Sequence, residues 1–191
     1  MALEHNHDER HAADIFRAAG ALIISMADQQ AGVVARIAAM AAEALARGRR
    51  IYVLGCGGSA ADAQHFAGEM VGRFKKERRG LPCIALTTDT SILTAVGNDY
   101  GFEKVFERQV DALVEPGDLV IAISTSGNSA AVLVAARAAR RKGAQVAGMT
   151  GRGGGALKAE TDCCLCADSA ETCRAQECHA VAIHAICELV E

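Results

Sequence analysis

The stretch IYVLGCGGSA, residues 51–60, decides the class of the fold. Its first part, Ile51 to Leu54, is apolar at every position, which is typical of a strand buried on both faces of a parallel sheet. Glycines follow at once, and the chain then has helical character as far as Phe74. A buried strand that passes through glycines into a helix predicts a ligand-facing loop at the carboxyl end of the strand.

The same pattern returns along the rest of the chain. Further apolar runs predict strands at Cys83–Thr87, 119–123, 145–149 and 162–167. Helical segments are predicted between and after them, from about Thr90, from about Glu103, at Ala130–Lys142 and at Glu171–Val190. Buried strands that alternate with helices predict an α/β fold, in which helices flank a five-stranded parallel sheet in a three-layer, flavodoxin- or Rossmann-like arrangement.

Residues 1–48 form a separate segment in this reading. They are rich in alanine, with apolar residues at helical spacing, and Gly48 is a helix stop. We expect two helices with a break near Asp28 to Gly32. The predicted organisation is therefore a helical segment at 1–48 and an α/β domain at 49–191.

Composition excludes several classes of protein. The 191 residues carry a net charge of −3, so no basic field favours nucleic acid as a partner. No segment at the start has the order of a signal peptide, and the apolar runs are too short or interrupted to span a bilayer. We expect a cytoplasmic protein with no membrane partner. Its eight cysteines are then reduced, and those at 163, 164 and 166 are read as buried small side chains in a strand rather than as zinc ligands.

Two loops at strand ends are candidates for ligand binding. In the first, Gly57 and Gly58 let the backbone approach a ligand, although a tight turn alone would also explain them. The second loop places four hydroxyls at the start of a helix, on Ser124, Thr125, Ser126 and Ser129. Free N–H groups and the helix dipole favour an anion there, so this loop predicts a phosphate site; an ordinary helix cap is the alternative.

Two helices carry the other candidate residues. His65 and Glu69 lie one turn apart on the helix after the first loop. Gln176 and His184 lie on the last helix and can face one cleft, which His179 can also approach. A carboxylate with an imidazole is suited to moving a proton between adjacent carbons, and the same side chains suit one divalent metal. Taken singly, each histidine also fits a surface or hydrogen-bonded core residue.

Together these residues resemble the sugar isomerase (SIS) domain family and, within it, the phosphoheptose isomerases. The resemblance rests on GCGGSAADAQHFAGEMVGRF (55–74), LPCIALTTDTSILTAVGNDYGFEKVF (81–106), AISTSGNS (122–129) and RAQECHAVAIH (174–184). It implies an aldose–ketose isomerase that converts sedoheptulose 7-phosphate into D-glycero-D-manno-heptose 7-phosphate through an enediol. That reaction opens the synthesis of nucleotide-activated heptose for bacterial surface glycans.

The resemblance also implies residue roles. Glu69 is the base between C1 and C2, and His184 is the partner acid/base. The sugar is faced by Ser59, Asn98 and Asp99, and the phosphate by the four hydroxyls of the second loop. The implied cofactor is one zinc ion held by His65, Glu69, Gln176 and His184, and the implied assembly is a homotetramer joined through the N-terminal helices.

The sequence departs from the family pattern at Cys56, where asparagine is usual, and at Ala175, where a larger aliphatic residue is usual. The first change bears on the choice of substrate. Two alternatives stay open: a non-catalytic sugar-phosphate-binding member of the replication-initiator-associating type, and an isomerase for another phosphosugar. The basic run Arg73 to Arg79 is read as a solvated loop face, although one of its arginines could reach a phosphate.

Overall fold

The computed structural model describes the backbone of residues 2–191 and the side chains of residues 8–191. Five parallel strands form one sheet in the order β2-β1-β3-β4-β5. The prediction of a five-stranded parallel sheet is confirmed. The strands are β1 (Ile51–Gly55), β2 (Cys83–Ala85), β3 (Leu119–Ser124), β4 (Gln145–Thr150) and β5 (Cys163–Cys166).

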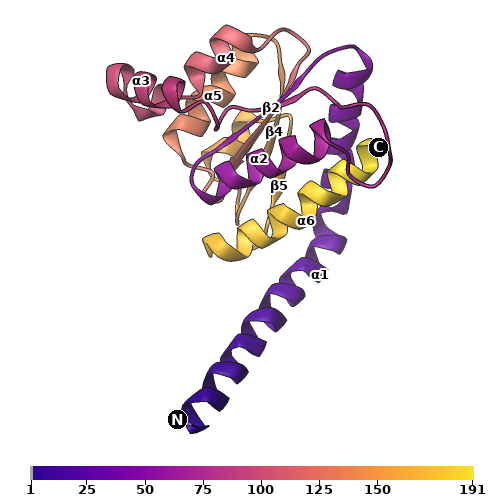
Figure 1. Ribbon diagram of the computed structural model, residues 1–191, viewed down its shortest axis with the longest axis vertical. Helices are drawn as coiled ribbons and strands as arrows, with labels where there is room; N and C mark the ends of the chain where they lie inside the picture. Colours follow the sequence, from indigo (N-terminus) through magenta and orange to yellow (C-terminus); the bar gives the residue numbers. More distant parts are fainter. Residues whose placement is uncertain (1) are drawn as a thin grey trace.

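Helices cover both faces of the sheet (Figure 1). One face is covered by α1 (Ala2–Ala46), α2 (Gly58–Val71) and α6 (Thr172–Val190), and the other by α3 (Thr90–Tyr100), α4 (Glu107–Leu113) and α5 (Ala130–Arg141), with short 3-10 helices at Phe102–Lys104 and Ala156–Glu160. Alternate residues of one strand enter different cores. Val53 packs on the side of α2 and α6, and Leu54 packs on the side of α5. The three-layer arrangement follows from this two-sided burial.

The N-terminal segment is one helix of 45 residues, so the prediction of two helices with a break near Asp28 to Gly32 is wrong. An apolar stripe continues across the expected break, from Met26 to Val33 and Ile37, all of which pack on one core. Gly32 faces open space, and a single glycine costs a helix only about 1 kcal/mol relative to alanine. The predicted stop at Gly48 is confirmed by its φ of 72°.

The two halves of α1 have different surroundings. Residues Ile37 and Ala41 of the second half are fully buried in the core. The first half projects away from the body (Figure 1) and leaves Phe16 and Ile24 78% and 72% exposed. By length and composition α1 is also the one helix among the described residues that could cross a membrane. The prediction that the apolar runs are too short or interrupted to span a bilayer is therefore wrong for α1 by length and composition, although the second half of this helix packs in the core.

The cysteines lie mostly inside this fold, and all eight are free thiols. Cys163 packs toward α1, whereas Cys164 lies beside the Thr150 hydroxyl on the opposite face of β5. Adjacent strand cysteines thus point apart, as predicted. Burial raises the pKa of Cys187 to about 12 and also raises that of Cys83.

Candidate active site

The two predicted ligand loops lie side by side because β1 and β3 are neighbours in the sheet, with Gly55 opposite Ile123. They open a cavity of about 300 Å³ at the carboxyl ends of these strands. Its lining includes the predicted binding residues Gly57, Gly58, Ser59, Ser124, Thr125, Ser126, Ser129 and Gln176, together with Cys56, Ile123 and Thr172. A pocket at this edge is where ligands bind in open α/β sheets.

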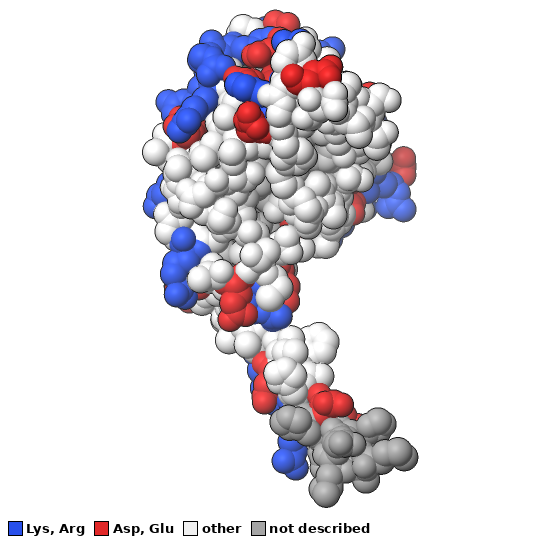
Figure 2. Space-filling view, turned by 90° about the vertical axis from the view of Figure 1, so that its left-hand side faces the viewer, with Lys and Arg blue, Asp and Glu red and all other residues white. Residues whose placement is uncertain are grey.

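Little charge surrounds the pocket. The carboxyl ends of the strands, where α2 and α6 begin, lie on the left of Figure 1 and face the viewer in Figure 2. In that view Lys, Arg, Asp and Glu gather at the top of the body and where α1 leaves it, and the broad middle is mostly uncharged. An anion in this pocket would be held by hydroxyls, backbone N–H groups and the α5 dipole rather than by a salt bridge.

The first loop depends on its glycines at two points. Gly57 has a φ of 61°, a conformation that L side chains rarely adopt. A Cβ on Gly58 would collide with the side-chain amide of Gln176. The absence of a side chain at 58 therefore allows α6 to bring Gln176 against the start of α2. These glycines do more than make a tight turn.

The second loop is held by its own hydrogen bonds. The Ser126 hydroxyl accepts from the Asn128 N–H at 3.1 Å, and the Asn128 side chain accepts from the Ala156 N–H at 3.0 Å. Ser129 is the N-cap residue of α5, yet its hydroxyl makes no capping bond. The ordinary-cap explanation therefore fails for Ser129, and this hydroxyl stays available to a ligand.

Cys56 lies at the boundary between the two loops. Its Sγ atom is 3.7 Å from the Ser129 Oγ, and the thiol also packs against the apolar core below α5. The residue that departs from the family pattern thus borders the hydroxyl loop directly. A thiol is a weaker hydrogen-bond partner than an asparagine amide.

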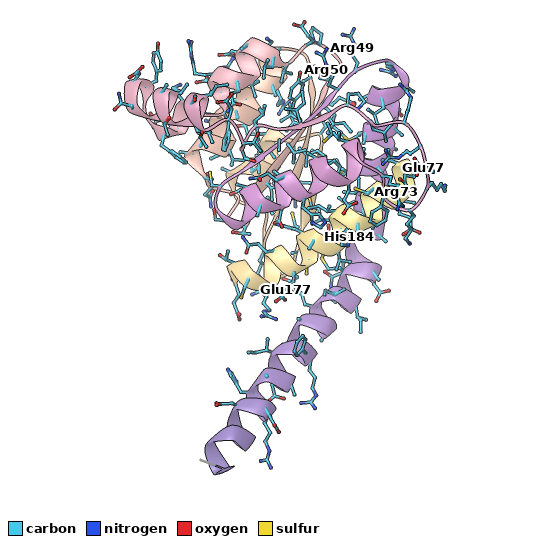
Figure 3. The ribbon with its side chains drawn as sticks, viewed as in Figure 1. Arg49, Arg50, Arg73, Glu77, Glu177 and His184 are labelled. Carbon is cyan, nitrogen blue, oxygen red and sulfur yellow. The ribbon has the colours of Figure 1, made fainter. Side chains whose placement is uncertain are left out.

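A second group of side chains joins α2 to α6. The Nε2 atom of His65 lies 3.3 Å from the Glu69 Oε1 and 3.2 Å from the Nε2 of His184. The two imidazole rings meet edge to face, with an interplanar angle of 86°. Figure 3 shows His184 on the part of α6 that lies beside α2. The predicted meeting of these residues, which spacing alone left open, is present in the structure.

These three side chains carry nitrogen and oxygen donors of the kind that zinc binds. Their ligand atoms all lie within 4.8 Å of one another. Two N or O ligands about 2.0–2.1 Å from a tetrahedral Zn²⁺ lie roughly 3.3–3.4 Å apart. The 3.2 and 3.3 Å separations around His65 match that spacing. These two separations are therefore compatible with ligands of one zinc ion.

Comparison with known proteins identifies the family. The model of the SIS domain family matches residues 15–151. The chain belongs to the SIS domain family. It is 54% identical over 175 residues to the phosphoheptose isomerase of Geobacter sulfurreducens, covering 92% of this chain and 93% of that one. It is 56% identical over 164 residues to the phosphoheptose isomerase of Roseiflexus sp., covering 86% and 83%.

Solved structures of SIS domain proteins agree with this. The phosphoheptose isomerase of Neisseria gonorrhoeae superimposes with a TM-score of 0.90 at 40% identity, covering 95% of this chain and 97% of that one. The enzyme of Francisella tularensis gives 0.92 at 33% identity, covering 96% and 97%. The predicted family and the predicted enzyme class, an isomerase, are confirmed.

Other predicted residues of this SIS domain lie elsewhere. Asn98 and Asp99 end α3 outside the described pocket, and the Asn98 amide donates to the Asp99 carboxylate at 2.8 Å. Their contact with the sugar stays a prediction. His179 does not approach the cleft: it is fully buried, and its Nε2 donates to the Thr150 carbonyl at 3.0 Å. The alternative of a core histidine holds for this residue.

Sequence reasoning missed two residues near the site. Phe74 stacks on the His184 ring with centroids 5.5 Å apart. Arg78, predicted to belong to a solvated loop face, is only 14% exposed and pairs with Glu191. The prediction is wrong for Arg78, because a run of charged residues looks exposed in the sequence and does not indicate the distant partner Glu191. It fits Arg73, which pairs with Glu77 at 3.7 Å on the surface (Figure 3).

Proposed function

We propose that this chain isomerises sedoheptulose 7-phosphate to D-glycero-D-manno-heptose 7-phosphate, the first step toward nucleotide-activated heptose. The observation that carries the proposal is the meeting of His65 and Glu69 on α2 with His184 on α6. Gln176, also on α6, lines the pocket of the hydroxyl loop. The helix α6 would thus contribute to substrate binding through Gln176 and to proton transfer through His184.

The phosphate would be bound by the second loop. Ser124, Thr125, Ser126 and Ser129 line the pocket at the start of α5, and the first N–H groups of a helix have no partner inside that helix. Neutral donors hold a phosphate monoester while still allowing its release. The sugar carbons would then extend over the glycines of the first loop, where no side chain obstructs them.

The proton would be moved by Glu69. Its carboxylate would take a proton from C1 of the ketose, which gives an enediol, and return a proton to C2, which gives the aldose. At the same time O1 loses a proton and O2 gains one, a transfer for which the imidazole of His184 is suited. Glu69 and His184 come from different helices, so the packing of α2 on α6 sets their separation.

The proposed cofactor is one zinc ion per subunit, held by His65, Glu69, Gln176 and His184. When bound, zinc would polarise the oxygens of the substrate as a Lewis acid. The two roles proposed for His184 exclude each other at any moment, since an Nε2 lone pair that binds a metal cannot accept a proton. The Glu69 carboxylate has two oxygens and can serve both roles.

The assembly proposed is a cytoplasmic homotetramer. Support comes from the apolar side chains that α1 leaves exposed, Phe16 and Ile24. An apolar groove between α1 and α6 adds to this surface and is lined by Ile23, Met26, Ala27, Ala31, Val34, Cys178, Val181, Ala182, Ala185 and Leu189. A second copy of the chain is a suitable occupant because both surfaces are apolar.

Incubation of the purified protein with sedoheptulose 7-phosphate, with and without zinc, tests the proposal. We expect the aldose product to appear. Binding without turnover in both conditions would support the non-catalytic binding alternative. Turnover of a different ketose phosphate in preference to the seven-carbon sugar would support an isomerase for another phosphosugar, and Cys56 would then be the first residue to exchange for asparagine.

A further inference from the structure

A buried ion pair joins the end of α6 to the loop that follows α2. Glu191 comes directly after α6, and its side chain is only 1% exposed. Its Oε1 lies 2.9 Å from the Arg78 Nε, so the two side chains form an ion pair. The loop that carries Arg73 and Glu77 passes beside this end of α6 (Figure 3).

The Glu191 carboxylate also holds the backbone of that loop. Its Oε1 accepts from the Phe74 N–H at 2.8 Å, and its Oε2 accepts from the N–H groups of Lys75 and Lys76 at 2.8 and 2.9 Å. Burial raises the pKa of this carboxyl, but the three N–H donors and the Arg78 charge outweigh burial and lower the pKa to about 2. The carboxylate is thus ionised and accepts three backbone hydrogen bonds.

The Arg78 guanidinium holds the end of α2 at the same time. Its Nη2 donates to the Glu69 carbonyl at 3.0 Å, and its Nη1 donates to the Met70 and Gly72 carbonyls at 2.9 and 3.3 Å. Carbonyls in the last turn of a helix have no partner inside that helix. Arg78 therefore caps the turn that carries the Glu69 side chain.

The same loop reaches His184 through Phe74. The Phe74 ring stacks on the His184 ring at an interplanar angle of 27° and is packed against the core. Because Glu191 accepts the Phe74 N–H, the position of this aromatic ring depends on the carboxylate. One ion pair thus connects the backbone of Glu69 with the ring of His184.

We propose that Arg78 and Glu191 are positioning residues, which set the placement of the Glu69 carboxylate against the His184 imidazole. The inference rests on the proposed isomerase function. It adds two residues that are not part of the pocket lining; Arg78 meets the three-residue cluster at the backbone carbonyl of Glu69. A misplacement of about 1 Å by a remote change can lower a rate by about 100-fold, so loss of this ion pair has a measurable consequence.

A neighbouring ion pair provides the matched control. Lys75 and Glu188 join the same loop to the same helix at 2.6 Å, but their side chains are 59% and 56% exposed. Exposed pairs contribute little to stability, about 0–1 kcal/mol. Glu188→Gln therefore removes a carboxylate one turn away without releasing the loop backbone.

Steady-state kinetics on four single variants and one double variant tests the proposal. We expect Glu191→Gln and Arg78→Lys to lower kcat about 10- to 100-fold with KM changed less than about twofold, because orientation rather than binding is lost. Phe74→Leu should lower kcat in the same way, and Glu188→Gln should match the parent. In the double variant of Phe74→Leu and Glu191→Gln, the loss of kcat, expressed as a free energy, should be smaller than the sum of the two single losses, since both changes act through one ring.

A readout independent of activity is the NMR signal of the His184 ring protons in histidine-labelled protein. The Phe74 ring current shifts these signals, and we expect Glu191→Gln to move them toward the Phe74→Leu values while circular dichroism stays at the folded value. Unchanged His184 signals together with unchanged kcat in Glu191→Gln would overturn the proposal. If Glu191→Gln does not fold, kcat and the His184 ring-proton signals are measured in Arg78→Lys instead, with the same expected results. If the parent has no isomerase activity, the proposed function fails and the ring-proton shift still tests the positioning.

Discussion

The Nε2 atoms of His65 and His184 lie 3.2 Å apart across the interface between α2 and α6. At that distance one nitrogen donates and the other accepts, or both bind a common cation. The Glu69 Oε1, 3.3 Å from the His65 Nε2, completes the group. A metal centre would use His65 as a ligand, whereas an acid–base pair formed by Glu69 and His184 alone would not need it.

The variant His65→Ala tests that distinction. We expect it to lose bound zinc, measured by elemental analysis of the purified protein, and to lower kcat at least about tenfold, since loss of one of few ligands strongly weakens a zinc site. Zinc added back in excess should restore part of the activity. If His65→Ala keeps full turnover in a chelator, the zinc proposal is overturned and Glu69 and His184 act without a metal.

Glu69→Gln tests the proton transfer. The amide keeps the size of the side chain but cannot take a proton, and general-base catalysis contributes typically about 10²- to 10⁴-fold. We expect kcat to fall by that amount while the affinity for sedoheptulose 7-phosphate, measured by calorimetry, changes little. Loss of binding together with turnover would instead make Glu69 a ligand or a structural residue.

The fold and the two loops could be predicted from the sequence because their signals are local. Ile51 to Leu54 is apolar throughout, and four hydroxyls occur at one helix start, so strand, loop and helix follow from neighbouring residues. Continuity of α1 was missed for the opposite reason. Polar residues near Asp28 and a glycine at 32 resemble a break, whereas burial against β5 and α6 overrides these weak local preferences.

The parts of the site that depend on distant contacts could not be predicted. Nothing near Glu191 in the sequence indicates that its carboxylate binds the backbone at Phe74, more than 100 residues earlier in the chain. The histidines of the last helix show the same limit. His179 and His184 are five positions apart, yet one is buried on the Thr150 carbonyl and the other faces α2.

Gly58→Ala tests the approach of Gln176 to the first loop. The backbone at Gly58 does not require glycine, but the new Cβ would occupy the place of the Gln176 amide. Since that amide ends a flexible side chain, we expect the free energy of unfolding to change by less than about 1 kcal/mol while kcat falls as it does in Gln176→Ala. Urea titration and steady-state kinetics measure the two effects.

Gly68→Ala is the control for that change, because Gly68 lies on the same helix and faces open space. It should leave activity unchanged. The double variant Gly58→Ala, Gln176→Ala should be no slower than either single variant. A Gly58→Ala protein with parental kcat would show that the position of Gln176 against the loop does not contribute to the reaction.

Because His179 is buried, we expect the protein to lose stability in mild acid. Burial lowers its pKa below the ordinary value of 6.5 and outweighs the bond to Thr150, so the native protein resists a proton that the unfolded chain accepts. Stability is then complete above pH 6.5 and is lost as the pH falls below it, by up to about 1.4 kcal/mol per pH unit. Urea unfolding between pH 7 and 5 measures this slope. The slope should be smaller in His179→Gln, and equal slopes in the two proteins would contradict the prediction.

From the ionised Glu191 carboxylate we expect a second loss of stability, in stronger acid. The pKa of its carboxyl is lowered from 4.5 to about 2, because the N–H groups at 74–76 and the Arg78 charge outweigh burial. The stabilisation from the ionised carboxylate is therefore present above pH 4.5 and disappears as the pH falls toward 2. Acid unfolding followed by circular dichroism should show the parent and Glu188→Gln losing stability together over this range. Glu191→Gln should start less stable and vary less with pH, so that its curve converges with theirs near pH 2; a constant gap between the curves would mean that the carboxylate charge does not hold the loop.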